Sequence, residues 1–341
     1  MLGTRLKLAL DGGLSLPESG TIAVFEPPVD ADLSALPKER VEVISRFYPD
    51  HQVFKARGYK VSTAPSVGYA AAVVCLPRSK PLGRLLVAWG RHLLADKGPV
   101  IVDGQKEDGV DSMLKACRER VLIDAPVNKA HGKLFVIEDG DFVDWWVDPG
   151  KTADGWETQP GVFSADGVDR ASALLAAELS SLKGHGADLG AGWGYLSAMA
   201  LKQNEGIKAL HLVEADYPAL DSAEQNIDDE RAQFHWNNAL TWRPDRMLDF
   251  VIMNPPFHQG RKQDPELGRA FIRAAAGMLA PRGILLMVAN AHLGYENVLD
   301  ENFGEVSRIG GDRSFKLFRA ERPSRQSPRT GLGSGTGRQG R

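Results

Sequence analysis

The sequence predicts an α/β protein with two doubly wound domains, each built around a mostly parallel sheet. The first observation is length, because 341 residues exceed what one hydrophobic core ordinarily organises. The second is an alternation of apolar strand-like and helical segments, which is typical of parallel sheets covered by helices. The third is composition, since 43% hydrophobic and 25% charged residues supply two cores and exclude a wholly disordered chain.

The sequence also disfavours several other classes of protein. No apolar run reaches the ~18 residues that span a bilayer, and no small-residue cleavage site follows residues 1–11, as a secretory signal would require. Cys75 and Cys117 stand in no metal-ligand spacing. We therefore expect a cytoplasmic protein without a membrane contact, a disulfide or a metal site. We also expect a monomer.

The first half of the chain is patterned less clearly than the second. Apolar runs predict buried strands at 21–25, 71–76, 99–102 and 134–137, with helical stretches between them. None of these strands leads into a glycine-rich turn of the cofactor-binding type. Two Pro-Gly pairs punctuate the polar stretch 148–161, where a chain tends to turn. We expect one domain over 1–150 and a boundary in this stretch.

The second half alternates regularly. Its patterning predicts strands at 187–190, 209–214, 233–237, 250–253 and 283–289, and helices at 168–182, 195–202, 218–227 and 265–279. Two further runs, at 305–309 and 314–320, would add an antiparallel hairpin at one edge and complete seven strands. The domain is expected over 151–320. Residues 321–341 contain five Arg and one Glu among Gly and Ser, and we expect a disordered tail.

A glycine-rich turn carries the first chemical signal. The segment Asp188-Leu-Gly-Ala-Gly-Trp-Gly194 ends a predicted strand and opens a helix, and its glycines let the backbone approach a ligand closely. Dinucleotide sites space their glycines Gly-x-Gly-x-x-Gly, whereas the Gly-x-Gly-x-Gly found here, led by an acid, favours S-adenosyl-L-methionine. We predict cofactor contacts at the amino-acid part from Asp188, Gly190, Gly192 and Gly194, at the ribose from Glu214, and beside the adenine from Asn238 and Ala239.

The second signal is Asn254-Pro255-Pro256-Phe257, which directly follows the predicted strand 250–253. Two prolines fix the backbone and remove two donors, so that the Pro255 carbonyl is presented outward. That carbonyl and the Asn254 side-chain oxygen offer two acceptors to one planar amino group. Phe257 offers a face on which a flat ring can stack. We predict that Asn254, Pro255 and Phe257 are catalytic, the alternative being a purely structural Pro-Pro turn.

Together the two motifs resemble those of class I S-adenosylmethionine-dependent methyltransferases that act on exocyclic or amide nitrogens. Residues 160–169, 254–260 and 288–295 further resemble the bacterial ribosomal RNA guanine-N2 methyltransferases of the RsmC type. In that family the first half is a decayed copy of the methyltransferase fold, and here residues 75–80 lack the Asn and the second Pro of the catalytic motif. The resemblance implies two Rossmann-like methyltransferase domains, of which the C-terminal one is catalytic.

The resemblance also implies the reaction. The enzyme would transfer a methyl group from S-adenosylmethionine to the N2 amine of a guanine in 16S ribosomal RNA, with the RNA or the small subunit as its partner. A guanine in large-subunit ribosomal RNA is one alternative. A protein glutamine methyltransferase is another, although such enzymes usually carry Tyr at the place of Phe257. A non-enzymatic RNA-binding protein is the third, and the intact Asp188, Glu214 and Asn254 argue against it.

The charge distribution suggests where RNA would bind. The net charge is −3, yet residues 46–91 hold eight basic residues and one acid. Such a stretch can neutralise phosphates, although acidic neighbours in space would make it an ordinary solvated surface. The predicted RNA contacts are Lys55, Arg57, Lys60 and Arg78 of the first half, and His258 beside the catalytic motif.

Overall fold

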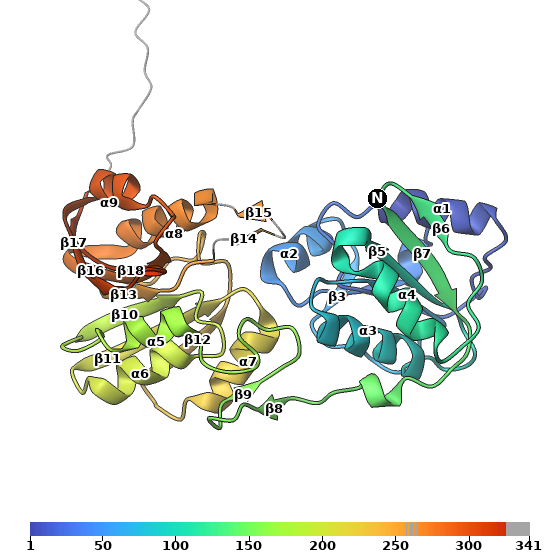
Figure 1. Cartoon of the computed structure of the whole chain (residues 1–341), viewed down its shortest axis with the longest axis horizontal. Helices are drawn as coiled ribbons and strands as arrows, with labels where there is room; N and C mark the ends of the chain where they lie inside the picture. Colours follow the sequence, from blue (N-terminus) through green and yellow to red (C-terminus); the bar gives the residue numbers. More distant parts are fainter. Residues whose placement is uncertain (257, 260–261, 264, 325–341) are drawn as a thin grey trace, which may run out of the picture.

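A computed structural model of the chain shows two α/β units lying side by side (Figure 1). It describes residues 1–256, 258–259, 262–263 and 265–324, and of 258–259 and 262–263 only the backbone. Each unit is built on one seven-stranded sheet. The predicted α/β class, with two mostly parallel sheets, is confirmed.

The N-terminal sheet has the strand order β3-β2-β1-β4-β5-β7-β6. The first five strands are parallel, and β7 and β6 form an antiparallel hairpin at one edge. The four strands predicted in this half are present as β1, β4, β5 and β7, whereas the patterning does not predict β2, β3 and β6. The elements are α1 (Leu2–Asp11), β1 (Ile22–Phe25), β2 (Val41–Ile44), α2 (Tyr48–Ala56), β3 (Lys60–Ser62), β4 (Ala71–Cys75), α3 (Lys80–His92), β5 (Val100–Gln105), α4 (Val110–Arg118), β6 (Val127–Lys129) and β7 (Gly132–Ile137), with 3-10 turns at Lys38–Arg40, Lys106–Asp108 and Val143–Trp145.

The C-terminal sheet repeats this order strand for strand, as β12-β11-β10-β13-β16-β18-β17. Its last two strands are again antiparallel. β18 continues past the boundary predicted at residue 320, because Glu321 and Pro323 pair with Glu305 and Phe303. The elements are α5 (Arg170–Ala176), β10 (Gly184–Leu189), α6 (Tyr195–Gln203), β11 (Ile207–Glu214), α7 (Tyr217–Asn226), β12 (Ala232–Trp236), β13 (Leu248–Met253), α8 (Pro265–Met278), β16 (Leu279–Asn290), α9 (Glu296–Asn302), β17 (Phe303–Gly311) and β18 (Phe315–Pro323), with a two-stranded ribbon of β14 (His258–Gln259) and β15 (Lys262–Gln263).

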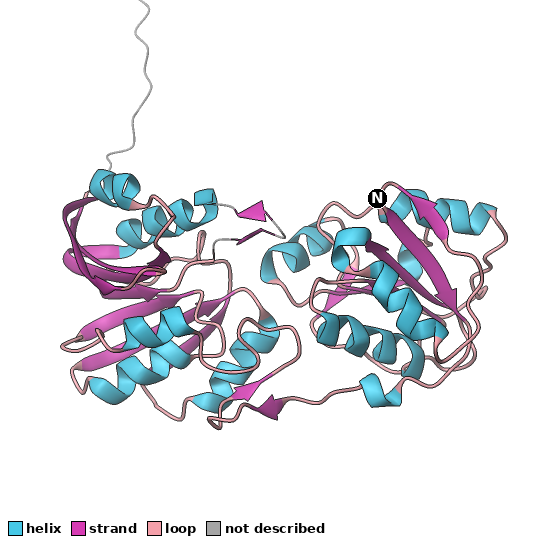
Figure 2. Cartoon of the chain, viewed as in Figure 1, coloured by secondary structure: helices cyan, strands magenta, loops and turns pink. Residues whose placement is uncertain are grey.

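Helices cover both faces of each sheet (Figure 2). In the C-terminal unit, α5, α6 and α7 share one core with β11 and β13, while α8 and α9 pack on the opposite face. In the N-terminal unit, α1 and α2 cover one face and α3 and α4 the other. Because strands buried on both faces are mostly apolar, β1 and β4 read as continuous hydrophobic runs.

The predicted boundary at 148–161 contains a small hairpin of β8 (Gly150–Lys151) and β9 (Glu157–Thr158). The hairpin is fastened to α7, since the backbone N–H of Glu157 donates to the side chain of Asn226 and the Asn226 amide donates back to the Glu157 carbonyl. The linker therefore lies against the C-terminal unit. The tail from residue 325 lies outside the described residues.

The two units meet at equivalent places. Tyr48-Pro49 opens α2 after strand β2, and Tyr217-Pro218 opens α7 after strand β11. The Tyr48 N–H donates to the Ala215 carbonyl at 2.8 Å, and the Tyr217 N–H donates to the Arg46 carbonyl at 2.9 Å. This antiparallel bridge centres on Phe47 and Asp216, so the junction has approximate two-fold symmetry.

Candidate functional site

The glycine-rich turn lies at the carboxyl end of β10, where parallel sheets of this class bind their ligands. Gly190, Gly192 and Gly194 all have positive φ, at 77°, 56° and 91°. A Cβ built on Gly192 would meet no atom within 4 Å, whereas one on Gly194 would press against Ile227. Gly192 therefore borders open space, and Gly194 serves the packing of α6 against α7.

Glu214 ends the neighbouring strand and organises the loops around it. One carboxylate oxygen accepts the N–H of Gly192 at 2.8 Å, and the other accepts the N–H groups of Ala215 and Asp216. Burial raises the pKa of Glu214 above its ordinary value. The predicted ribose ligand thus ties the glycine turn to the loop that meets the N-terminal unit.

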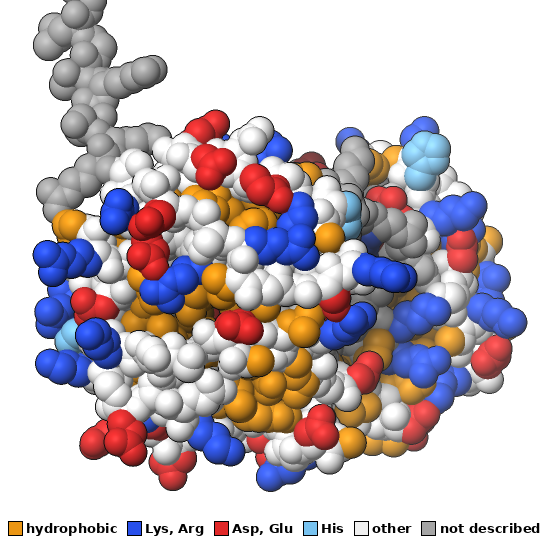
Figure 3. Space-filling model, turned by 60° about the vertical axis from the view of Figure 1, so that its left-hand side comes forward, with side chains coloured by type: hydrophobic (Ala, Val, Ile, Leu, Met, Phe, Trp, Pro, Cys, Tyr) orange, Lys and Arg blue, Asp and Glu red, His pale blue; other side chains and the backbone are white. Residues whose placement is uncertain are grey.

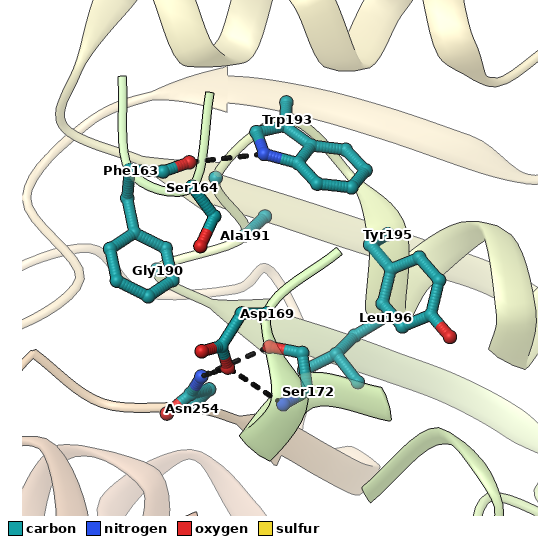
Figure 4. A pocket seen from close by; sticks show the side chains of 11 residues that line it. Phe163, Ser164, Asp169, Ser172, Gly190, Ala191, Trp193, Tyr195, Leu196 and Asn254 are labelled. Atoms are coloured by element: carbon teal, nitrogen blue, oxygen red, sulfur yellow. Dashed lines mark hydrogen bonds between the residues drawn. The ribbon is translucent and has the colours of Figure 1, made fainter. Parts of the chain in front are cut away.

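Asn254 directly follows the central strand β13. Its amide nitrogen donates to a carboxylate oxygen of Asp169 and to the hydroxyl of Ser172, both at 3.0 Å. Figure 4 shows the amide oxygen turned away from these two residues. The side chain therefore presents a hydrogen-bond acceptor on its other side.

Two cavities meet at Asn254. We call the first the glycine-loop cavity; it is lined by Phe163, Ser164, Asp169, Ser172, Asn254 and residues of 190–196 (Figure 4). The second, the strand-end cavity, is lined by Phe163, Asp169, Ala171, Asn254, Pro255, Ala289, Asn290, Leu293, Tyr295 and Phe315. Phe163, Asp169 and Asn254 border both. Two ligands could therefore meet beside the Asn254 amide.

Asp188 lies elsewhere than the sequence suggests. Strand side chains alternate, so Ala187 and Leu189 face the core under α8 and Asp188 points to the α6 side. It is fully buried, accepts a hydrogen bond from the Ser197 hydroxyl at 2.8 Å, and lines neither cavity. Burial raises its pKa to about 7. Among the described residues its second oxygen has no hydrogen-bond partner.

The remaining predicted cofactor residues are placed differently from one another. The Asn238 side chain accepts the N–H of Leu240 and so stabilises its own turn, while Ala239 is buried in the core beneath α8. Pro255 lines the strand-end cavity. Phe257 and the side chain of His258 lie outside the described residues.

The predicted RNA contacts of the first half, Lys55, Arg57, Lys60 and Arg78, are exposed, but their charges are not equally available. Lys60 forms an ion pair with buried Glu42 at 2.9 Å, and the guanidinium of Arg57 lies over the Phe54 ring. Elsewhere in the same stretch Arg46 and Arg91 are also paired with acids. These ion pairs leave the stretch 46–91 with less unpaired positive charge than its sequence suggests. Figure 3 shows basic and acidic side chains interspersed over the face that it draws.

Sequence reasoning gave no role to four residues that line the glycine-loop cavity: Phe163, Ser164, Asp169 and Ser172. Asp169 is the N-cap of α5, accepting the N–H of Ser172 at 2.8 Å. An acid before an apolar helical run signals such a cap. Nothing in the local pattern indicates that the same carboxylate reaches Asn254, which is far away in the sequence.

Comparisons with known proteins show which family and fold the chain resembles. A family model described as "Methyltransferase small domain" matches residues 156–319. The solved structure of the T. thermophilus 16S rRNA N2 G1207 methyltransferase (RsmC) in complex with AdoMet and guanosine aligns with a TM-score of 0.75 at 22% identity, covering 94% of this chain and 92% of that one. That likeness shows a shared two-domain fold.

Curated relatives are closer in sequence. Ribosomal RNA small subunit methyltransferase C of Salmonella choleraesuis is 32% identical over 256 residues, which cover 71% of this chain and 73% of the relative. The protein of the same name from Salmonella typhi is 31% identical over the same shares. Every helix in the described part of the chain is too short or too polar to span a bilayer. The chain belongs to the ribosomal RNA small subunit methyltransferase C family.

Proposed function

We propose that this protein transfers a methyl group from S-adenosylmethionine to the N2 amine of a guanine in 16S ribosomal RNA. The observation that carries the proposal is the meeting of two cavities at Asn254, one bordered by the glycine turn and the other by the end of strand β16. Family membership, and the 16S rRNA on which the structurally similar T. thermophilus enzyme acts, support the substrate.

The residues present fit the cofactor. Gly192 borders open space at a positive φ, so the backbone leaves room that a side chain would fill. Gly190 and Gly192 would hold the amino-acid part, and Glu214 would exchange its bonds to backbone N–H groups for the ribose hydroxyls. Asp188 supports the turn from behind through Ser197. The cofactor supplies the electrophilic methyl group.

Asn254 and Pro255 would orient the guanine amine in the strand-end cavity. Each offers one oxygen to one N–H of the amine, which aims the nitrogen lone pair at the glycine-loop cavity. Holding both hydrogens favours a tetrahedral nitrogen and frees that lone pair. No strong base is required, because the proton is lost after transfer, and catalysis rests on positioning and on preorganised acceptors.

The target base must leave its stack to enter the cavity. Phe163 is 60% exposed and borders both cavities, and its backbone carbonyl is held by the Trp193 indole N–H at 3.0 Å. Its ring is available to stack on an extruded base, as Phe257 is expected to do. The N-terminal domain would bind RNA, with Lys55, Arg57 and Arg78 as its phosphate contacts.

Mapping modified nucleotides in a strain that lacks this protein tests the proposal. Its 16S ribosomal RNA should lose one N2-methylguanosine, and purified protein with S-adenosylmethionine should restore it. An intact set of N2-methylguanosines in that rRNA would refute the proposal. Loss from large-subunit RNA would reassign the substrate, and loss of a methylated glutamine would replace the RNA with a protein.

A further inference from the structure

We propose that Asp169 and Ser172 are positioning residues that fix which end of the Asn254 amide faces the methyl acceptor. This inference deepens the proposed function and rests on it. An asparagine amide has one acceptor end and one donor end of almost the same shape. Only the oxygen end can bind an amine, because the nitrogen end would place donor against donor.

The contacts around Asn254 select one orientation. The amide nitrogen donates to Asp169 and to Ser172, both at 3.0 Å. A rotated amide would bring its oxygen against the Asp169 carboxylate oxygen, which can only accept when ionised. Ser172 alone could not decide the matter, since a hydroxyl both donates and accepts. Asp169 therefore fixes the orientation of the Asn254 amide, and the Ser172 hydroxyl accepts the second hydrogen bond from the amide nitrogen.

The carboxylate is itself held in place. The Asp169 oxygen that receives Asn254 also accepts the backbone N–H of Ser172 at 2.8 Å, as the cap of helix α5. The next residue, Arg170, is paired with Asp312 in the turn between β17 and β18 and lies over Phe315. The first turn of α5 thus contacts both strand β18 and the turn that precedes it, and these contacts restrain Asp169.

The orientation of the Asn254 amide matters because only its oxygen can accept a hydrogen bond from the substrate amine. Figure 4 shows Asp169 and Ser172 together on one side of Asn254, with the amide oxygen directed away from them. If the amide rotated in part of the molecules, that fraction would be inactive, while the glycine turn would still bind cofactor. The predicted signature is a lower kcat with an unchanged cofactor affinity.

The substitution Asp169→Asn tests the inference with little damage to the fold, because Asn caps helices as well as Asp does. Its amide can donate as well as accept, so the Asn254 orientation is no longer fixed. We expect kcat for methyl transfer to fall at least ~10-fold, on the scale of a misplaced catalytic hydrogen bond, with cofactor affinity within about twofold. Ser172→Ala should give a smaller loss, and Ser222→Ala, which removes another buried hydroxyl, none.

A double-mutant cycle separates positioning from a structural role. Asn254→Ala removes the amide, so Asp169→Asn should then cause no further slowing. Equal slowing by Asp169→Asn in both backgrounds, or normal turnover in Asp169→Asn alone, would overturn the inference.

A second measurement does not depend on activity. In nitrogen-15-labelled protein, the Asn254 side-chain NH2 resonances, assigned by their loss in Asn254→Ala, should shift and exchange faster with water in Asp169→Asn. Unchanged resonances would overturn the positioning role. If the wild type methylated no guanine, the proposed function would fail, and these resonances would still decide the orientation.

Discussion

The sheets of the two domains have the same topology, but the loops at their carboxyl edges differ. Both sheets follow one strand order, position by position, with the same antiparallel pair at the end. In the C-terminal domain, β10 leads through the glycine turn into α6. In the N-terminal domain, residues 26–40 join β1 to β2 without an α-helix, and the turn opens on Glu26, which keeps a positive φ of 46°.

The residues that follow β13 and its counterpart β4 also differ between the two domains. Strand β13 is followed by Asn254, whose amide is held by two hydrogen bonds. Strand β4 is followed by Leu76, which is buried in the apolar core. The comparison teaches that two domains can keep the same strand order while they differ in the few loop residues on which the proposed chemistry depends.

The largest expected effect concerns Asn254 and its counterpart in the N-terminal domain, Leu76. Asn254→Ala should slow methyl transfer at least ~100-fold, as the loss of one well-placed hydrogen-bonding group does, with cofactor affinity retained in calorimetry. Leu76→Ala, at the matching place, should leave turnover of the folded protein unchanged and cost roughly 2–5 kcal/mol of stability as a core cavity. Near-normal turnover in Asn254→Ala would remove its catalytic role.

The second effect concerns the charges of the N-terminal domain. Replacing Lys55, Arg57 and Arg78 by Ala should weaken RNA binding about tenfold or more and flatten its salt dependence, by roughly 0.9 in log–log slope for each duplex phosphate that is no longer neutralised. Cofactor affinity should stay the same. Lys60→Ala is the sharper control, because Lys60 is already paired with Glu42 and should contribute less. An unchanged slope in the triple variant would end this assignment.

The third effect concerns Asp188, the buried acid that precedes the glycine turn; strand β1, the counterpart of β10 in the N-terminal domain, holds only buried apolar residues. Asp188 keeps its proton up to about pH 7 in the folded chain, against an ordinary pKa of 3.8. The folded state thus binds the extra proton between these values, and its stability falls as the pH rises through them. Asp188→Asn should remove this loss, worth at most about 1.4 kcal/mol per pH unit.

Denaturant titrations of both proteins between pH 4 and pH 8 measure the Asp188 effect. The variant should gain stability relative to the wild type as the pH rises. A constant difference across the range would show that Asp188 titrates normally.

The smallest expected effect concerns the junction between the two domains. The Tyr48 ring packs on Trp236 with centroids 5.2 Å apart, and the Trp236 indole donates to the Ala215 carbonyl. Because Ala215 also donates to Glu214, Tyr48→Ala should weaken cofactor binding about three- to fivefold, the scale of one aromatic pair. Tyr59→Ala, which removes a ring packed on Phe54 within the N-terminal domain, should not. Equal affinities in both variants would uncouple the junction from the cofactor site.

Sequence patterning predicts the C-terminal domain well because its strands are long or flanked by diagnostic turns. It misses β2 in the N-terminal domain for a physical reason. The strand holds Glu42 at a buried position, stabilised by Lys60 and Ser62 of the neighbouring β3. A buried charge with a partner on another strand has no local signature.

The residues of the candidate site also differ in whether the sequence predicts them. Gly192 and Asn254 are predicted by motifs of adjacent residues, and the structure brings both to the cavity edge. The burial of Asp188 follows from the strand alternation, which a motif does not encode. The contact between Asp169 and Asn254 depends on how α5 packs against the end of β13, so it is visible only once the chain is folded.

Calorimetric titration with S-adenosylmethionine tests most directly whether one copy alone carries the chemistry. The wild type should bind one molecule per chain, and Gly192→Val should bind none, because the valine side chain would occupy the open space beside the turn. Gly68→Val in the N-terminal domain is the matched control, since Gly68 also combines a positive φ with open space, and it should bind normally. Two molecules per wild-type chain, or one still bound by Gly192→Val, would contradict the account.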